Sequence, residues 1–493
     1  MNSFRHSLTV CAAAAAALLT FSSVAAAVDA SAPRQVTLQV YDIGLTLVGE
    51  LRSITAQAGE SDVFVRQLPT QLDPASVSVT PTAGGASLDV LEQRFEYDLS
   101  DANRLLRRYL GRTLSVGSGS NAREGRLVGL PTWREPPFPS EPLVLAQPDG
   151  ALVSFYSPLD AGRIAFPGAA KVIYDEPTLV WRARIPAEGM QNIRLGYVMD
   201  GLSWQAVYDV VLEPGARLAR LSGRIGLQNK SGGSFSNATV VLLETERGRL
   251  GGDPENPAET FPSRYSYSSP QPRDERTIAS LIPLQTHSLG QKVTLSDGDS
   301  VFLPLASVAQ LPVSRIYVYD GVRFDRFQRN RRNDWSYGTE YHTTVDTYLE
   351  FENKENVGLG LNLPPGRLRL FQRADDDSVE LLGSDTLSAV ENGASGQLRV
   401  GPARGLRGER ERTGYAEVRP LHEYEESFEI RLSNDSDQAA TIRVVEHLYR
   451  WPEFEIVKAD ADYQATGPQS IEFQVELKAG GRKTIHYTVR YRW

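Results

Sequence analysis

Histidines are the first residues to test for metal or acid–base chemistry. Beyond residue 27 they are His287, His342, His422, His447 and His486. No two lie four positions apart and none belongs to an H-E-x-x-H sequence, so the spacing of a helical zinc site is absent. The adjacent Glu446 and His447 would not converge on a metal, because neighbouring side chains on a strand point to opposite faces. We therefore predict no metal and no cofactor, although separate strands could still bring ligands together.

Three short sequences imitate catalytic or ligand-binding motifs. Residues 201–205, GLSWQ, begin like a nucleophile elbow but lack its second glycine and the strand–helix context. Residues 480–484, GGRKT, end like a phosphate-binding loop but lack its upstream glycine, and a hairpin turn explains them better. Residues 375–377 are three aspartates without the ligand spacing of a calcium loop, which indicates a solvated turn. No catalytic residue is predicted from these sequences.

Carboxylates leave two interpretations open. Glu446 lies between Val444 and Leu448 on one predicted strand face, so it is expected to be partly buried. Pairing with an arginine would make it structural, whereas an isolated buried carboxylate would be a catalytic candidate. We favour the structural role. Glu423, Glu425 and Glu426 could serve a glycosidase, but the separation that matters is spatial and spacing alone cannot test it.

The best binding candidate is a segment that mixes arginine with aromatic residues, within residues 315–341. Arginine binds phosphate or carboxylate through two hydrogen bonds and also stacks on rings. Anionic envelope glycan or lipid would suit such a segment, and an exposed loop without a ligand is the alternative. The predicted binding residues are Arg323, Arg326, Arg329, Arg331, Arg332, Trp335 and Tyr337.

These candidates must be positioned by strands, because the apolar pattern is that of β-structure. In residues 195–244, Trp204, Ala206 and Tyr208 alternate with polar residues at period two, between turns marked by Gly and Pro. Strands of this length and spacing are typical of a two-sheet sandwich. The predicted structural core includes Trp204, Tyr208, Glu446, Tyr449 and Trp451.

The whole chain is predicted to be mainly β, with tandem β-sandwich domains plus a small inserted β-barrel-like unit with one short helix. That helix is expected over residues 100–110, where leucines pair four positions apart and two arginines precede Gly111. No exact internal repeat is visible in the sequence. The expected parts are a signal peptide (1–27), an N-terminal β unit (28–98), the helix and barrel-like unit (99–165), a β-sandwich with a mobile loop at 247–277 (166–312), and a C-terminal β-sandwich (313–493).

The N-terminus predicts export. Arg5 precedes an apolar run over residues 8–19 and the small residues Ala25-Ala26-Ala27, the pattern of a secretory signal cut after Ala27. Twelve helical residues reach only about 18 Å, short of a bilayer core of about 30 Å. Removal of this segment takes away Cys11, the single cysteine. We therefore expect a periplasmic or extracellular bacterial protein without disulfides and without a transmembrane segment after cleavage.

Several passages of the sequence are distinctive in combination. They are residues 93–98, 105–111, 202–208, 227–232, 237–238, 351–354, 363–366, 446–451 and 487–493. Together they resemble a bacterial secreted family, the domain of unknown function 4139 family, over nearly all of the chain beyond the signal. Relatives labelled mucoidy-inhibitor-like have a long coiled coil before the sandwich, whereas this sequence has no heptads there. The resemblance implies a β-rich envelope protein and transfers no catalytic residues.

Composition and motifs together favour a non-catalytic protein. The formal charge of −9 argues against general nucleic-acid binding. We expect a binding or structural component of the bacterial cell envelope, with an envelope protein, glycan or lipid as its partner. The alternatives are a hydrolase of envelope polymers, with carboxylates drawn from different strands, and an assembly component that uses exposed sheet edges.

Overall fold

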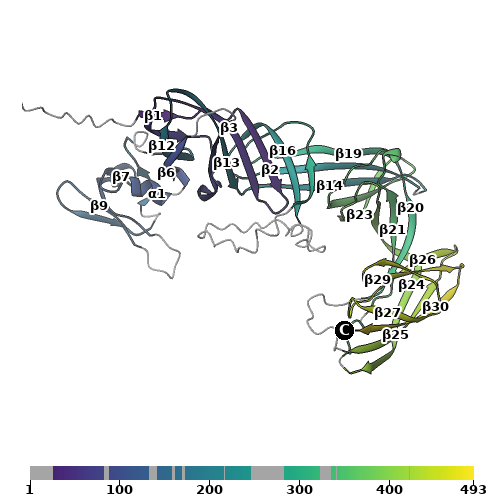
Figure 1. The fold of residues 1–493 in the computed structure, drawn as a ribbon. Coiled ribbons are helices and arrows are strands. Elements are labelled where there is room, and N and C mark those ends of the chain that lie inside the picture. The colour runs from purple at the N-terminus through teal and green to yellow at the C-terminus, as the bar shows by residue number, and fades with distance from the viewer. Residues whose placement is uncertain are drawn as a thin grey trace, which may run out of the picture.

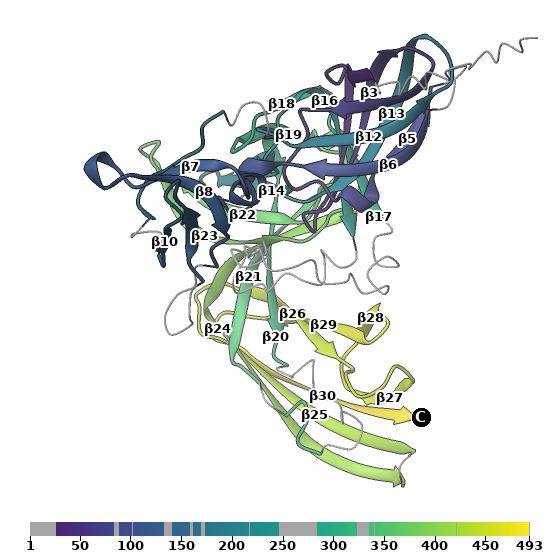
Figure 2. The same ribbon diagram turned by 90° about the vertical axis from the view of Figure 1, so that its left-hand side faces the viewer.

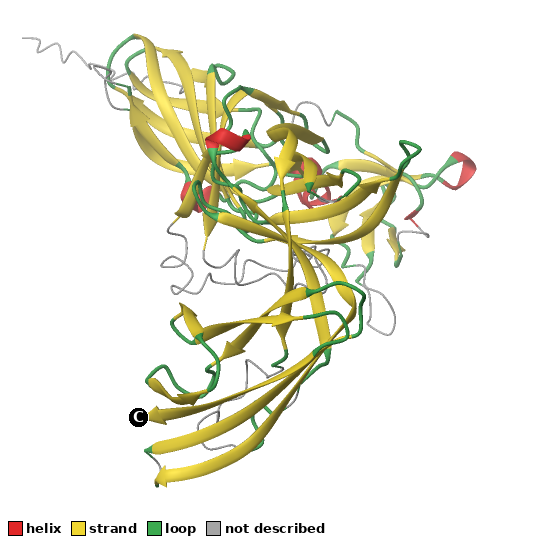
Figure 3. Cartoon of the chain, turned by 90° about the vertical axis from the view of Figure 1, so that its right-hand side faces the viewer, coloured by secondary structure: helices red, strands yellow, loops and turns green. Residues whose placement is uncertain are grey.

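Strands dominate the fold, as Figure 3 shows. The computed structural model describes residues 26–82, 88–100, 102–132, 141–157, 161–168, 173–215, 217–245, 283–322, 335–339, 341–420 and 422–492. The strands belong to five sheets, which confirms the prediction of a mainly β protein. Short 3₁₀ turns are η1 (Pro74–Ser76), η2 (Asp98–Ser100), η3 (Gly119–Asn121) and η5 (Glu355–Val357).

The described chain has the shape of an L, with the N-terminal sheets in one arm and the C-terminal sheet in the other (Figure 1). Two sheets lie at the N-terminal end. The four-stranded sheet has the order β1 (Ala26–Asp29), β4 (Gly59–Val65), β12 (Thr178–Ile185), β6 (Asp89–Glu96). The seven-stranded sheet has the order β17 (Pro283–Ser288), β16 (Phe235–Thr245), β2 (Gln35–Tyr41), β3 (Thr46–Ala56), β13 (Gly189–Met199), β5 (Ser78–Pro81), with β18 (Val293–Leu295) paired to β16.

Two more sheets meet at the corner of the L. The central sheet has the order β19 (Ser300–Pro312), β15 (Leu218–Asn229), β14 (Leu202–Leu212), β22 (Gly366–Arg373), β23 (Val379–Leu387). The C-terminal sheet has the order β27 (Phe454–Ala459), β30 (Arg482–Arg492), β25 (Glu423–Asn434), β24 (Ser395–Arg419), β21 (Thr344–Glu352), β20 (Ser314–Asp320), β26 (Ala440–His447), β29 (Ser470–Leu477), β28 (Tyr463–Gly467).

The inserted unit is an open sheet, so the prediction of a barrel-like unit is wrong. Its strand order is β10 (Leu152–Phe155), β9 (Leu143–Ala146), β8 (Arg123–Gly129), β7 (Thr113–Val116), β11 (Ile164–Ala165), and Figure 2 shows it to one side of the other sheets. Among the described residues its end strands, β10 and β11, do not pair with one another, and β11 pairs with β7 through only two residues. The predicted helix is present as α1 (Ala102–Arg108), shorter than expected, and buries Leu106 in the core of this unit.

Apolar alternation accounts for the two larger cores. In β14 the side chains of Trp204, Ala206 and Tyr208 are all buried and belong to one core, which extends from the N-terminal sheets through the central sheet. The second core lies on the C-terminal sheet and contains Tyr449, with Trp451 partly buried against it. Glu446 is fully buried beside this second core.

Three buried asparagines reveal a structural repeat that the sequence does not display as an exact repeat. Asn229, Asn353 and Asn434 each follow or end a strand, and each is completely buried. Their side-chain Nδ2 atoms donate to equivalent backbone oxygens, those of Ser296 (3.0 Å), Glu391 (3.0 Å) and Lys478 (3.1 Å). Their backbone N–H groups donate to Asp299, Ala394 and Gly481, each three residues further along.

The strands around each asparagine are arranged alike. The strand before it pairs antiparallel with a returning strand, as β15 does with β19, β21 with β24, and β25 with β30. The strand after it pairs in parallel with an earlier strand, as β16 does with β2, β22 with β14, and β26 with β20. The seven-stranded, central and C-terminal sheets therefore share one repeated arrangement of strands.

Two predicted segments lie mainly outside the described residues, namely the signal peptide at 1–27 and the loop at 247–277. The described chain begins at Ala26, in β1, which pairs in parallel with β4. Cleavage after Ala27 would thus fall inside this strand. Among the described helices, none is long and apolar enough to cross a membrane.

Candidate functional site

Two polar hollows adjoin at the corner of the L, where β20, β21 and β23 lie (Figure 1). The larger has a volume of about 300 Å³ and lies over β20 and β21. Val318 of β20 pairs with Asp346 of β21, so alternate residues of both strands face the same side. The lining residues of this hollow are Val318, Asp320, Val322, His342, Asp346 and Tyr348.

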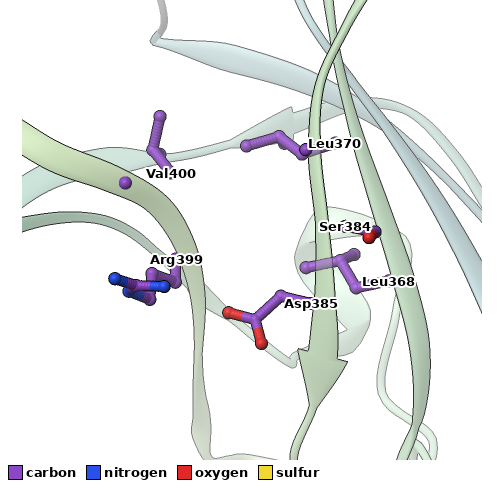
Figure 4. A pocket seen from close by; sticks show the side chains of 8 residues that line it. Leu368, Leu370, Ser384, Asp385, Arg399 and Val400 are labelled. Carbon is purple, nitrogen blue, oxygen red and sulfur yellow. The ribbon is translucent and has the colours of Figure 1, made fainter. Parts of the chain in front are cut away.

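The smaller hollow lies between the central and C-terminal sheets and has a volume of about 170 Å³. Leu368 and Leu370 of β22 form an apolar wall, and Ser384 and Asp385 of β23 form a polar one. Arg399 of β24 closes the other side, and Figure 4 shows the Asp385 carboxylate directed toward the side where Arg399 lies.

An ion pair joins the two hollows. Arg399 donates from Nε and Nη2 to the two carboxylate oxygens of Asp346, at 3.1 Å each. Arg399 lines the smaller hollow and Asp346 the larger, so their ion pair links the two neighbouring hollows, which together are called here the corner groove. A guanidinium held at both nitrogens is fixed in orientation, which pre-arranges the wall between the hollows.

Tyr348 lies at the electrostatic centre of the corner groove. Burial, followed by the Asp346 carboxylate, raises the pKa of Tyr348 above its ordinary value, and Asp320 and Asp385 act in the same direction. Its phenol therefore stays protonated at neutral pH and can donate a hydrogen bond. The groove brings three carboxylates, one guanidinium and one phenol together, so its lining has an excess of negative charge.

His447 borders the groove through Asp320. Its Nε2 atom lies 3.1 Å and 3.0 Å from the two carboxylate oxygens of Asp320. This hydrogen bond raises the pKa of His447 above its usual value, against the opposing effect of burial. Among the described residues no group of three or more His, Cys, Asp or Glu side chains could hold a metal ion. The groove thus offers hydrogen-bonding and charged groups for a ligand.

The predicted binding segment lies next to this groove, because the described residues at its two ends, Val322 and Tyr341, lie at the rim. Val322, which lines the larger hollow, forms a β-bridge with Tyr341, so the two ends of the segment meet there. Arg323, Arg326, Arg329, Arg331 and Arg332 lie outside the described residues.

The two predicted aromatic ligand contacts have different surroundings. Trp335 is 69% exposed, whereas Tyr337 is only 4% exposed. The Tyr337 ring packs edge-on against Tyr449, with centroids 5.4 Å apart. The position of Tyr337 therefore fits a packing role, and only Trp335 presents its surface to solvent.

Beneath this turn, Glu446 belongs to a buried charge cluster. Arg410 Nε donates to both carboxylate oxygens of Glu446, at 3.1 Å and 2.9 Å, and Tyr487 donates its hydroxyl to the same carboxylate. Burial and the Glu446 carboxylate raise the pKa of Tyr487 well above its ordinary value, so it remains a donor. Arg410 also donates to the backbone oxygen of Gly338, at 2.8 Å, which anchors the turn at 335–339.

The same combination of Glu, Arg and Tyr recurs twice. Glu426 accepts from Arg412, Arg450 and Tyr449. At the other end of the molecule, Glu50 accepts from Arg52 at 2.6 Å and from Tyr197 at 2.7 Å. Each of these buried carboxylates is occupied by basic and phenolic donors, so the geometry supports the structural role predicted for Glu446.

The structure places the three motif-like sequences on strands and in turns. Ser203 is within β14 and pairs with Gln228 of β15, so no strand-to-helix elbow is present at that position. Residues 480–481 lie in the turn between β29 and β30, and residues 482–484 begin β30. Residues 375–377 lie in the turn between β22 and β23.

Sequence reasoning missed the corner groove. Its polar residues, Asp320, His342, Asp346, Tyr348, Asp385 and Arg399, come from β20, β21, β23, β24 and the residue pair before β21. One signal was available, because Asp346 and Tyr348 alternate with Val345 and Leu349 and so predict a polar strand face.

Comparisons with known proteins return no relative: no family model matches the chain, and no curated protein matches it.

Proposed function

We propose that this protein is an exported, non-catalytic component of the bacterial cell envelope that binds an envelope partner in the corner groove. The observation that carries the proposal is the groove itself, which combines three carboxylates with Arg399 and Tyr348 around open space. Such polar groups at the wall of a hollow fix the orientation of a bound partner.

Three further features support this proposal. The N-terminal signal pattern supports export to the periplasm or the outer surface, and the resemblance to a bacterial secreted family agrees with it. The large core shared by the N-terminal and central sheets supports an arrangement of tandem β-sandwiches. The buried carboxylates Glu50, Glu426 and Glu446 are tied to arginines, which suits a rigid scaffold.

A hydrolase of envelope polymers is the second candidate, favoured by one observation. Asp346 pairs with Val318, and Asp320 lies two residues further along the same strand, so the two aspartates are diagonal neighbours in one hollow. Diagonal neighbours have Cα atoms about 7–8 Å apart, so their carboxyl groups can reach the separations of about 5–10 Å that glycosidases use. Binding is favoured because both carboxylates already have basic partners, His447 and Arg399.

The test compares capture of envelope material by the immobilised full chain and by an Asp346→Asn/Asp385→Asn variant. Loss of charged hydrogen bonds should reduce capture by about tenfold or more. Asp437→Asn, an exposed aspartate between β25 and β26, is the matched control and should capture as the parent does. Equal capture by the double variant and the parent would refute binding in the groove.

A separate assay addresses the hydrolase. Purified chain would be incubated with envelope polymers and new reducing ends would be measured. Turnover that disappears in both Asp320→Asn and Asp346→Asn would replace the binding proposal with catalysis, whereas absence of turnover removes this alternative.

A further inference from the structure

Strand β23 is an edge of the central sheet, and no described strand pairs with its outer side. The opposite edge, β19, contains Pro304 and two register irregularities. Other end strands are short, as β1, β10 and β11 are, or irregular, as β27 and β28 are. Proline, bulges and shortness are the features that keep natural edge strands from pairing with another chain.

The nine residues of β23 have one of these features, a register irregularity at Leu382, but the strand is neither short nor interrupted by proline. They contain no Pro, Lys or Arg, and no described strand pairs with the outer edge. Val379, Leu381 and Leu382 are 50%, 60% and 39% exposed. The single irregularity of β23 lies between Leu381 and Gly383, which leaves a regular stretch from Val379 to Leu381. An edge of this composition offers free backbone donors and acceptors beside an apolar surface.

The far end of β23 borders the acidic corner groove. Gly383, Ser384 and Asp385 form one wall of the smaller hollow, so a side chain from a strand alongside β23 would reach that space. Of the three carboxylates in the groove, Asp346 pairs with Arg399 and Asp320 with His447, whereas no described basic side chain forms an ion pair with Asp385. A positively charged side chain would therefore be favoured beside Asp385.

We propose that β23 receives an extended, basic segment of another polypeptide, which adds to the central sheet and places a Lys or Arg side chain in the corner groove. This inference rests on the proposed binding function and names its partner class. Main-chain hydrogen bonds along the edge supply affinity, and the acidic groove supplies the preference for a basic side chain. An anionic glycan or lipid would be repelled by the same carboxylates.

The test uses the full chain and a fluorescein-labelled nine-residue peptide of alternating lysine and valine, the length of β23. Fluorescence anisotropy should show binding that weakens with salt. Two matched probes separate the contribution of positive charge from that of main-chain hydrogen bonds. The glutamate–valine peptide lacks the positive charge, and a lysine–valine peptide methylated on alternate backbone nitrogens cannot complete a ladder. Both should bind about tenfold more weakly or worse.

Protein variants locate the site. Successive N–H groups of a strand point to opposite sides, so of Glu380→Pro and Leu381→Pro one removes an outward N–H and the other an N–H toward β22. The variant that keeps the parent unfolding temperature should weaken peptide binding by about tenfold. Asp385→Asn should weaken it by a similar factor, while Asp377→Asn at the hairpin tip should leave it unchanged.

Several outcomes would overturn strand addition. One is equal binding of the methylated and unmethylated peptides, which would indicate charge alone. Another is peptide binding unaffected by either proline variant. Self-association of the chain that both proline variants abolish would assign the edge to a second copy instead. If the peptide fails to bind while envelope capture remains sensitive to Asp346→Asn/Asp385→Asn, strand addition is wrong and the proposed function stands.

Discussion

Asn229 and Asn434 hold two different turns with the same set of hydrogen bonds. In each, Oδ1 accepts from the backbone N–H and the hydroxyl of the serine two residues later, Ser231 or Ser436. In each, Nδ2 donates to a carbonyl four residues later and to one just before the returning strand. A buried amide used in this way satisfies carbonyls that no strand partner reaches.

The first prediction is that loss of a repeat asparagine destabilises the fold. Asn353→Ala removes the amide that donates to the backbone oxygens of Leu361, Val390 and Glu391, and should lower the free energy of unfolding by about 2–3 kcal/mol. Asn353→Asp should cost more, because a carboxylate would face those carbonyls. Urea unfolding followed by circular dichroism measures both. Asn356→Ala, at an exposed position nearby, should be neutral, and a neutral Asn353→Ala would contradict the role given to this residue.

The second prediction concerns the buried pair of Glu446 and Arg410. Glu446→Ala leaves a buried guanidinium uncompensated and should reduce the free energy of unfolding by about 3–5 kcal/mol. The double variant Glu446→Leu/Arg410→Met should recover much of that loss, because an apolar pair replaces both charges. Glu455→Gln, in the exposed pair with Arg492, provides the control and should not change stability measurably.

Third, the two aromatic residues of the anchored turn should respond differently to truncation. Tyr337→Ala removes a buried ring that packs on Tyr449 and should cost about 3 kcal/mol. Trp335→Ala should leave the unfolding temperature unchanged, since its side chain is largely exposed. Differential scanning calorimetry distinguishes them. A destabilised Trp335→Ala protein would show that this ring packs against the fold in solution.

The fourth prediction is a pH dependence from His447. Asp320 and Glu446 raise the pKa of His447 and Arg410 lowers it, with a net shift upward from 6.5. The protonated form is thus favoured by the folded state. The resulting stabilisation is complete below pH 6.5 and is lost as the pH rises through the raised folded-state pKa.

The stabilisation that protonated His447 contributes to the folded state should be small. Both side chains of the His447–Asp320 pair are about a third or more exposed, so screening limits the contribution to about 0.5 kcal/mol. Urea midpoints of the parent and of His447→Gln, measured between pH 5.5 and 8, should converge as the pH increases. A difference that grows with pH would have the wrong sign.

The local pattern of apolar and polar residues was sufficient to predict the strands and the helix. The alternation of Trp204, Ala206 and Tyr208 predicts their shared buried face, and the two arginines before Gly111 predict the end of α1. Val444 and Leu448 likewise predict the burial of Glu446. These features depend only on the spacing at which side chains return to the same face of a strand or helix. That spacing can be read from residues close together in the sequence.

The corner groove and the repeat depend on long-range pairing. Asp346 and Arg399 meet because β21 pairs with β24, and Asp385 joins them from a strand of another sheet. No spacing along the chain encodes that meeting. The repeat was missed because its turns differ in length, since Nδ2 of Asn353 reaches Leu361 whereas that of Asn434 reaches Gln438. A barrel-like unit was expected because short strands with turns are common to barrels and open sheets.

The parallel pairing of β2 with β16 has a consequence for how the molecule is made. Thr37 lies beside Thr239, so the β2–β3 hairpin can pair with β16 only after about two hundred further residues have been synthesised. A lone hairpin is marginally stable in water. The nascent chain must therefore emerge through about half its length before its first large sheet can close, an interval in which a chaperone can hold it unfolded.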